Sequence, residues 1–300
     1  MTLTTLAAAA DATAPTIPTG LVASLAARTT VQLNWSPSTD IGGTGVAGYR
    51  VYRGGTLISG ASPVTALSYQ DPNLSYRTAY SYTVVSVDNA NNASAASAAA
   101  SITTDWELVF QDEFSRPDNS YNLNSTSWFN NGVPWGLRST RAYFSEPGSC
   151  GSSPPAEAYV AAGNLTDTRI TLDLVGSINA SFTGVVFWHS SPTLRHLPSY
   201  RVHVNVLNEN VYLSYYADDW SQSVWLASAT IPSSAIGTLR VEAISATRNS
   251  KVYFDGVLKI NYTETDTSRP NSGYAGMNAD LPAWGDPAPS TTVDNFILEK

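Results

Sequence analysis

The sequence predicts an all-β protein built from two β-sandwiches. Short runs in which apolar and polar residues alternate recur along the chain, and alternation with a period of two is typical of a strand with one buried face. Gly, Pro, Asn and Asp separate these runs at short intervals, as turns between antiparallel strands require. No apolar stripe with helical spacing exceeds a turn or two, and 300 residues are enough for two domains.

Composition changes near Thr104, which predicts a domain boundary there. Residues 1–104 carry no net charge, whereas residues 105–300 carry the whole net charge of −8. Seven of the eight Trp residues also lie beyond residue 104. We therefore expect an N-terminal arm over 1–14, a small sandwich over 15–104 and a larger sandwich over 105–300.

The overall composition excludes several classes of partner. The net charge of −8 argues against nucleic acids and anionic lipid surfaces, because both are bound by clustered Lys and Arg. No apolar run approaches the roughly 18 residues that span a bilayer, so membrane insertion is not expected. Cys150 is the only cysteine, so the chain forms neither an intrachain disulfide nor a Cys-based metal site.

The arm over residues 1–14 lacks the basic and apolar regions of a secretory signal. Two interpretations are open. Either a signal has been removed from a mature chain, or the protein leaves the cell by another route, as virion proteins do on lysis. On the second interpretation, we expect the arm to dock onto a partner.

Residues 15–104 alternate as the strands of a sandwich do. Inward positions are predicted at Val31, Leu33, Trp35, Tyr49, Val51, Tyr80, Tyr82 and Val84. The segment resembles a bacterial-type fibronectin type III domain in four places: Pro15–Leu21, Val31–Trp35, Ala47–Arg53, and Leu74 with Tyr80. The resemblance implies that Trp35 lies in the core. It also implies that Tyr80 forms a tyrosine corner, with its hydroxyl bonded back to the chain near Leu74.

Domains of this class are typical spacers or docking modules, and no chemistry is predicted for this one. We expect it, together with the arm, to hold the protein on a virion or cell-surface partner. A homo-oligomer is compatible with this role.

Residues 105–300 are predicted to form a two-sheet jelly roll. In one strand, Tyr200, Val202 and Val204 alternate with Arg201 and His203, which indicates a half-buried strand with its polar side chains pointing outward. The longest strand-like runs are Glu107–Phe114, Phe182–Trp188, Tyr200–Leu207, Val211–Tyr216, Leu239–Ile244, Lys251–Phe254 and Thr291–Leu298.

This second domain is similar to known jelly rolls. Leu108–Phe114, followed by Trp128, resembles the opening of concanavalin-A-like glucanases of the laminarinase type. Tyr253–Leu258, Ser272–Tyr274 and Val293–Phe296 resemble the closing strands of that superfamily and of laminin-G-like domains. The resemblance implies a concanavalin-A-like fold.

The catalytic pattern of those glucanases does not carry over. They place Glu-x-Asp-x-x-Glu on one strand, so that the carboxylates share a face and lie about 5 Å apart across the scissile bond. The nearest fragment here is Glu264-Thr-Asp266, followed by Ser268 and Arg269 in a segment that is typical of a turn. We therefore predict that the protein is not an enzyme.

A jelly-roll polysaccharide lyase or an atypical glycoside hydrolase remains an alternative. A lyase needs a Tyr or His base and an Arg or Gln that neutralises a uronate carboxylate. Arg201 and His203 could fill these roles, although such lyases often carry Gln-Ile-His where this strand reads Arg-Val-His.

Aromatic residues in loops are the candidate glycan-binding residues. Trp135, Trp220 and Trp284 each stand beside Gly, Pro or Asp, and an aromatic ring can stack on a sugar while nearby polar groups bind its hydroxyls. His203, on the predicted outward face, completes this set. For each Trp the alternative is burial under its own loop.

A structural calcium ion is the only cofactor considered, and none is required. Laminarinase-like folds often hold calcium near the last strand and the entry of the chain. Asp294 matches the last-strand Asp of that family by position. Asp112 and Glu113 are its candidate partners by strand pairing, since calcium prefers oxygen ligands.

Three functions follow from these patterns. The first is a non-catalytic surface protein, such as a phage decoration or fibre protein whose jelly roll faces outward and contacts host glycans. The second is a secreted bacterial carbohydrate-binding accessory module. The third is the lyase or hydrolase. The first two place the protein at a virion surface or outside the cell.

Overall fold

The structure is a computed structural model of the 300-residue chain. It describes residues 10–114, 128–130, 135–138, 141–144, 156–160, 162–175, 182–190, 198–205, 208–217, 223–232, 236–280 and 291–300. The described residues divide into strands and loops, and none of them forms a helix long and apolar enough to cross a membrane. The chain separates into two compact units, Met1–Glu107 and Leu108–Lys300.

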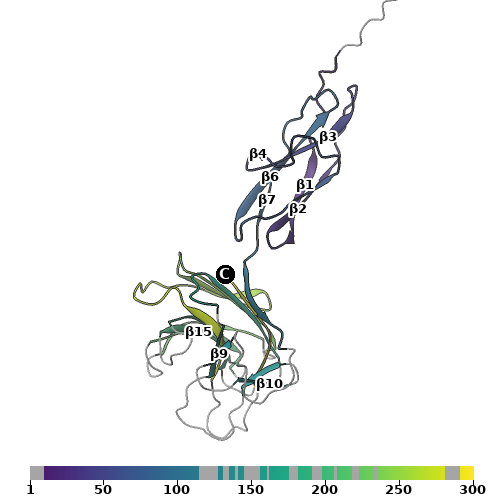
Figure 1. Cartoon of the computed structure of the whole chain (residues 1–300). Coiled ribbons are helices and arrows are strands. Elements are labelled where there is room, and N and C mark those ends of the chain that lie inside the picture. Colours follow the sequence, from purple (N-terminus) through teal and green to yellow (C-terminus); the bar gives the residue numbers. More distant parts are fainter. Residues whose placement is uncertain are drawn as a thin grey trace, which may run out of the picture. The chain divides into compact units, whose positions relative to one another are not determined.

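The first unit is a sandwich of two antiparallel sheets with the strand order of a fibronectin type III domain (Figure 1). One sheet has the order β1-β2-β5 and the other β4-β3-β6-β7. The strands are β1 (Thr19–Ala27), β2 (Thr30–Ser36), β3 (Val46–Arg53), β4 (Thr56–Leu57), β5 (Ser68–Asp71), β6 (Ala79–Asp88) and β7 (Ala100–Thr103).

Two predicted details of this unit are confirmed. Trp35 is buried and packs edge-on against Tyr49, with ring centroids 5.5 Å apart. The backbone N–H of Ser75, directly after Leu74, donates to the Tyr80 hydroxyl at 3.0 Å, as a tyrosine corner requires. The alternating residues of β2, β3 and β6 therefore form the core of this sandwich.

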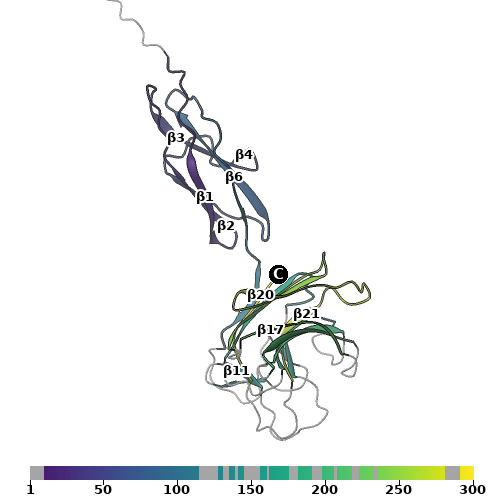
Figure 2. The same ribbon diagram turned by 180° about the vertical axis from the view of Figure 1, so that it is seen from behind.

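The second unit is a jelly roll in which two antiparallel sheets pack face to face (Figures 1 and 2). The seven-stranded sheet has the order β17-β16-β15-β14-β21-β12-β9, and the eight-stranded sheet the order β10-β11-β22-β13-β18-β19-β20, with β8 also paired to β22. The seven-stranded sheet comprises β9 (Trp128–Asn130), β12 (Ala156–Val160), β14 (Phe182–His189), β15 (Ser199–Asn205), β16 (Asn210–Tyr216), β17 (Ser223–Thr230) and β21 (Tyr274–Asp280). The eight-stranded sheet comprises β8 (Leu108–Asp112), β10 (Trp135–Arg138), β11 (Arg141–Phe144), β13 (Thr168–Leu174), β18 (Gly237–Ile244), β19 (Asn249–Phe254), β20 (Val257–Thr263) and β22 (Thr291–Glu299).

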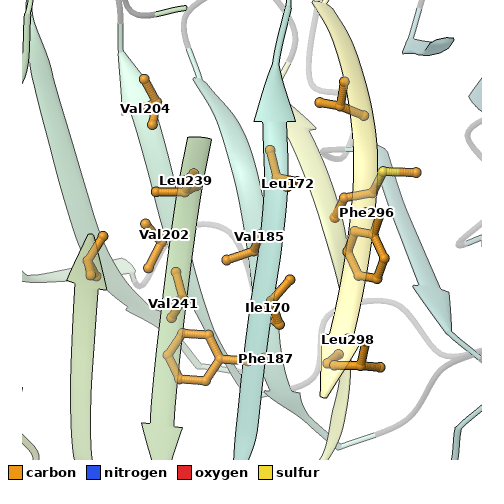
Figure 3. Packing of buried hydrophobic residues seen from close by; sticks show 14 of the residues in the cluster. Ile170, Leu172, Val185, Phe187, Val202, Val204, Leu239, Val241, Phe296 and Leu298 are labelled. Carbon is orange, nitrogen blue, oxygen red and sulfur yellow. The ribbon is translucent and has the colours of Figure 1, made fainter. Parts of the chain in front are cut away.

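Apolar side chains from both sheets meet in one core. Val185, Phe187 and Val202 from the seven-stranded sheet face Ile170 and Leu239 from the eight-stranded sheet (Figure 3). Because successive strand residues point to opposite faces, this core fixes which residues of β14, β15 and β16 point away from it. The core thereby positions the candidate site.

The predicted half-buried character of the strand around Tyr200 is wrong. Every residue of β15 is buried, including His203, which is only 1% exposed. The physical reason is the position of β15 between β14 and β16 inside the sheet, where its polar side chains pack against those of the neighbouring strand. Alternation predicted the two faces of the strand correctly but not the burial of the second face.

A buried ion pair ties the turn after β20 to β15. The Glu264 carboxylate is 5% exposed, pairs with the Arg269 guanidinium at 2.7 Å and accepts a hydrogen bond from the Tyr200 hydroxyl at 3.1 Å. Burial opposes ionisation of Glu264, but the hydrogen bonds from the Asp266 N–H and from Arg269 outweigh it and hold the pKa of Glu264 below its usual range. The Glu264-Thr-Asp266 fragment therefore lies in a turn, as predicted, and its Glu is committed to a structural contact.

Removal of Arg269 should destabilise the second unit strongly. Arg269→Met leaves the buried Glu264 charge uncompensated, which typically costs about 3–5 kcal/mol. The matched control is Arg240→Met, because Arg240 pairs with Glu242 at a more exposed position, where a pair is worth about 0–1 kcal/mol. Urea unfolding of both variants measures the difference, and equal losses of unfolding free energy would contradict the prediction.

Candidate functional site

The candidate site is the face of the seven-stranded sheet that points away from the core, here called the polar face. Its members on β15–β17 are Ser199, Arg201, His203, Tyr212, Ser214, Tyr216 and Trp225. Backbone pairing places Arg201 opposite Ser214, and His203 opposite Tyr212. Trp225 continues the first of these rows on β17, opposite Ser214. Three strands thus bring hydroxyl, guanidinium, imidazole and aromatic groups onto one surface.

Arg201 is held against an aromatic ring. Its guanidinium carbon lies 4.0 Å from the centre of the Tyr216 ring, a cation–π geometry, and the side chain is buried. His203 also lies near Tyr216, with ring centroids 6.1 Å apart. The Tyr216 ring therefore orients the one formal positive charge of β14–β17.

His203 is kept neutral by its surroundings. Burial, and then the neighbouring charge of Arg201, lower the pKa of His203 to about 3. At neutral pH the imidazole therefore offers one hydrogen-bond donor and one acceptor rather than a charge. Gly184 lies opposite His203 on β14, and a Cβ atom there would fall 1.8 Å from the carbonyl oxygen of Val202, so this position cannot carry a side chain.

Two buried hydroxyls on the polar face lack hydrogen-bond partners. Ser199 is 0% exposed and Ser214 is 1% exposed, and the Oγ atom of each has no partner. A buried polar group left unsatisfied costs about 1–3 kcal/mol, so such groups point to a bound water or ligand. Neither serine was identified from the sequence, where an isolated Ser in a strand carries no signal.

The exposed edge of the polar face is aromatic. Trp225 is 53% exposed, and Tyr212 packs edge-to-face against it with ring centroids 4.5 Å apart. A large exposed aromatic side chain beside buried hydrogen-bonding groups is the usual composition of a small-molecule or sugar site. The register of β16 with β17 places Trp225 on the polar face, which no pattern within its own strand could predict.

The aromatic residues predicted from loops cannot be placed beside this face. The predicted loop position of Trp135 is wrong, because it begins β10 in the other sheet, where pairing with β11 extends the strand; its side chain lies outside the described residues. Trp220 and Trp284 lie outside the described residues altogether. All three remain predictions, whereas His203 is positioned on the polar face, although buried rather than outward.

The predicted calcium ligands lie on or directly after two strands of the eight-stranded sheet, β8 and β22. Both oxygens of Asp112 accept hydrogen bonds, from the Phe114 N–H at 2.8 Å and the Trp128 indole N–H at 2.9 Å. The residue opposite Asp112 on β22 is Phe296, while Asp294 lies opposite Asp173. Glu113 is exposed and accepts from the Gln111 amide at 3.2 Å. Calcium binding by these residues remains a prediction.

Within the described residues, three carboxylates converge in the first unit instead. Asp11, Asp40 and Asp88 present oxygen atoms that lie within 4.8 Å of one another. Backbone N–H groups already hold each of them: Thr44 donates to Asp11 at 2.7 Å, Gly45 to Asp40 at 2.8 Å and Asn92 to Asp88 at 2.7 Å. Sequence reasoning missed this trio because its members come from three distant segments.

The relatives found by sequence comparison match only the N-terminal region of the chain. No family model matches the chain. Exoglucanase B of Cellulomonas fimi is 52% identical over 94 residues, which are 31% of this chain and 8% of that protein. Chitinase Chi52 of Paenibacillus xylanexedens is 44% identical over 94 residues, 31% of this chain and 17% of that protein. These matches fall on the N-terminal region, so the chain spans only a small part of these relatives.

The second unit has a distant structural neighbour. This neighbour is the carbohydrate-binding module CBM66 from Bacillus subtilis, which is 15% identical in sequence. The superposition covers 60% of this chain and 100% of the CBM66 chain, with a TM-score of 0.44. The fold of this unit is therefore defined by its own strand order, which is that of a two-sheet jelly roll.

The low pKa of His203 predicts a specific loss of stability in acid. In the unfolded chain His203 protonates near its ordinary pKa of 6.5, whereas in the folded chain it stays neutral down to about pH 3. The unfolded state therefore binds more protons between these values, and the free energy of unfolding falls as the pH is lowered through this window.

The variant His203→Asn lacks this contribution. Urea unfolding of both proteins at pH 7 and pH 4.5 should show a smaller acid loss of unfolding free energy in His203→Asn than in the native chain. Identical pH dependence of the two proteins would refute the assignment of a buried neutral imidazole.

Proposed function

We propose that residues 108–300 form a non-catalytic carbohydrate-binding module that acts outside the cell, with the fibronectin type III unit as its spacer. The observation that carries this proposal is the polar face. It combines the exposed ring of Trp225 with the buried, unpartnered hydroxyls of Ser199 and Ser214.

Sugars need both kinds of contact. The C–H faces of a pyranose pack on an aromatic ring, while its hydroxyls require hydrogen-bond donors and acceptors. Trp225 and Tyr212 supply the ring surface at the edge of the sheet. The serine hydroxyls and the neutral imidazole of His203 can each donate and accept a hydrogen bond. They can therefore pair with a sugar hydroxyl whether that hydroxyl acts as donor or as acceptor.

The setting favoured by the relatives is that of a polysaccharide-degrading system. Exoglucanase B and Chitinase Chi52 are named for action on polysaccharides, and each shares a segment of about 94 residues with this chain. This favours the secreted accessory module over the virion decoration or fibre protein that the sequence pattern first suggested. Both settings are extracellular, and the polar face would meet a glycan in either.

The absence of catalysis is part of the proposal. The sequence contains no Glu-x-Asp-x-x-Glu pattern, and Glu264 is engaged by Arg269 and Tyr200. For the lyase alternative, His203 with a pKa of about 3 is a poor general base near pH 7, because an effective base has a pKa close to the working pH.

The test is to incubate the full chain with a panel of neutral and acidic polysaccharides and to score retention and cleavage together. Retention without new reducing or unsaturated ends supports a binding module. New chain ends would overturn the non-catalytic reading and redirect attention to Arg201 and His203. Failure to retain any polysaccharide would refute carbohydrate binding.

Trp225 should carry much of the binding energy. Trp225→Ala should weaken retention of a bound polysaccharide about tenfold or more, since loss of an anchoring Trp typically costs about 2 kcal/mol or more. Tyr76→Ala is the matched control, because Tyr76 is an exposed aromatic residue of the first unit. Affinity electrophoresis of both variants measures the effect, and equal retardation of the two would count against the polar face as the site.

A further inference from the structure

We propose that the polar face binds single polysaccharide chains, either soluble or in amorphous material, and does not bind the flat surface of a crystalline polysaccharide. This inference rests on the proposed function and names the physical class of its ligand. It is carried by the angle between two aromatic rings, by a bulge in the sheet and by the burial of two hydroxyls.

The aromatic rings at the exposed edge of the polar face do not form a flat surface. The planes of Tyr212 and Trp225 are inclined at 77° to each other, with ring centroids 4.5 Å apart. Two rings at this angle cannot both stack on sugars that lie in one plane, and the edge of one ring already contacts the other. A crystalline polysaccharide presents its sugars in one plane, so this pair of rings does not match it.

The ring of Tyr216 is occupied on one side. The Arg201 guanidinium lies 4.0 Å from its centre, and the Tyr216 side chain is half-buried. Among the described residues of β14–β17, Trp225 is therefore the main aromatic contact that a ligand can reach, since it is 53% exposed. One exposed ring stacks on one sugar, whereas binding to a flat surface by stacking would need several rings in one plane.

The sheet is irregular at this point. β16 pairs regularly with β17 from Asn210 to Leu213, but the register shifts between Leu213 and Ser214, so that Ser214 lies opposite Trp225. Such a bulge increases the local twist of a sheet and changes the direction of the side chains beside it. Trp225 and Ser214 therefore lie on a twisted part of the polar face, which a single chain can follow and a flat surface cannot.

The serine hydroxyls of the polar face are buried, unlike the Trp225 ring beside them. Neither the Oγ atom of Ser199 nor that of Ser214 has a hydrogen-bond partner. A sugar in a crystal surface is held by its neighbours, so it cannot leave the plane to reach a buried hydroxyl. A sugar in a single chain can stack on Trp225 and still bring one of its own hydroxyls to Ser214, with either group as the donor.

The experiment compares two physical forms of the same polymer. The full chain is mixed with amorphous or microcrystalline cellulose, and with colloidal or crystalline chitin, and the bound protein is normalised to the accessible surface of each solid. Cellohexaose, chitohexaose and the soluble polymers of the wider panel serve as competitors. The amorphous form should bind the protein about tenfold more tightly than the crystalline form, because a flat surface cannot reach the two serines. Soluble chains of the same sugar should release the bound protein.

The variants test the residue assignment. Ser214→Ala should weaken binding of the soluble chain about fivefold, because one hydrogen bond to the ligand is lost. Thr168→Val is the matched control: the Thr168 hydroxyl is also buried and without a partner, but it lies on β13 in line with Ile170 and Leu172 of the core. It should leave binding within about twofold of the native chain. Urea unfolding establishes that both variants are folded, and the comparison among polymers needs no variant at all.

The outcomes separate the two proposals. Equal or tighter binding to the crystalline forms, or adsorption that soluble chains do not release, overturns the single-chain ligand and leaves carbohydrate binding standing. Binding that Ser214→Ala and Thr168→Val weaken alike overturns the assignment to the polar face. Retention of another soluble polymer, with no adsorption to either crystalline solid, supports the inference. Binding to none of these polymers, nor to the wider panel, refutes the proposed function and this inference with it.

Discussion

The apolar packing between the two sheets of residues 108–300 is the constraint on which the candidate site depends. Val185, Phe187 and Val202 must face the eight-stranded sheet to leave water, and burial of each such side chain contributes about 1.5–3 kcal/mol. Because successive residues of a strand point to opposite faces of the sheet, the residues between them point away from the core. Arg201 and His203 must emerge on the opposite face, so one core determines both what the sheet buries and what it presents.

The electrostatics of the polar face follow from that arrangement. Arg201 and His203 stand two residues apart on one face, and a buried imidazole beside a guanidinium is more stable without its proton. The guanidinium of Arg201 therefore packs on the Tyr216 ring, and the neutral imidazole of His203 lies near the same ring. The hydroxyls of Ser199 and Ser214 add polarity without charge. This combination suits the proposed ligand, which is rich in hydroxyls.

Glu264 and Asp112 are two carboxylates that stabilise the fold. Glu264 ties the turn after β20 to Tyr200 of β15, and Asp112 holds the Trp128 indole beside the core. In the sequence, Glu264 belongs to a fragment of the glucanase catalytic pattern, and Asp112 is a predicted calcium ligand. In the structure, each accepts hydrogen bonds that stabilise the fold. The same residue types therefore take different roles according to the donors that the fold brings to them.

The sequence by itself determined the all-β class, two domains and the inward residues of most strands, because these depend on local alternation and turn residues. The tyrosine corner at Tyr80 was implied by the resemblance to fibronectin type III domains. The sequence also determined that no Glu-x-Asp-x-x-Glu strand exists. Only the tertiary structure decided that β15 is buried on both faces, since this depends on its neighbours in the sheet. The register of β15, β16 and β17 likewise decided that Arg201, Ser214 and Trp225, which are far apart in sequence, share one row. Pairing between strands is a long-range interaction, and no pattern within a single strand encodes its partner.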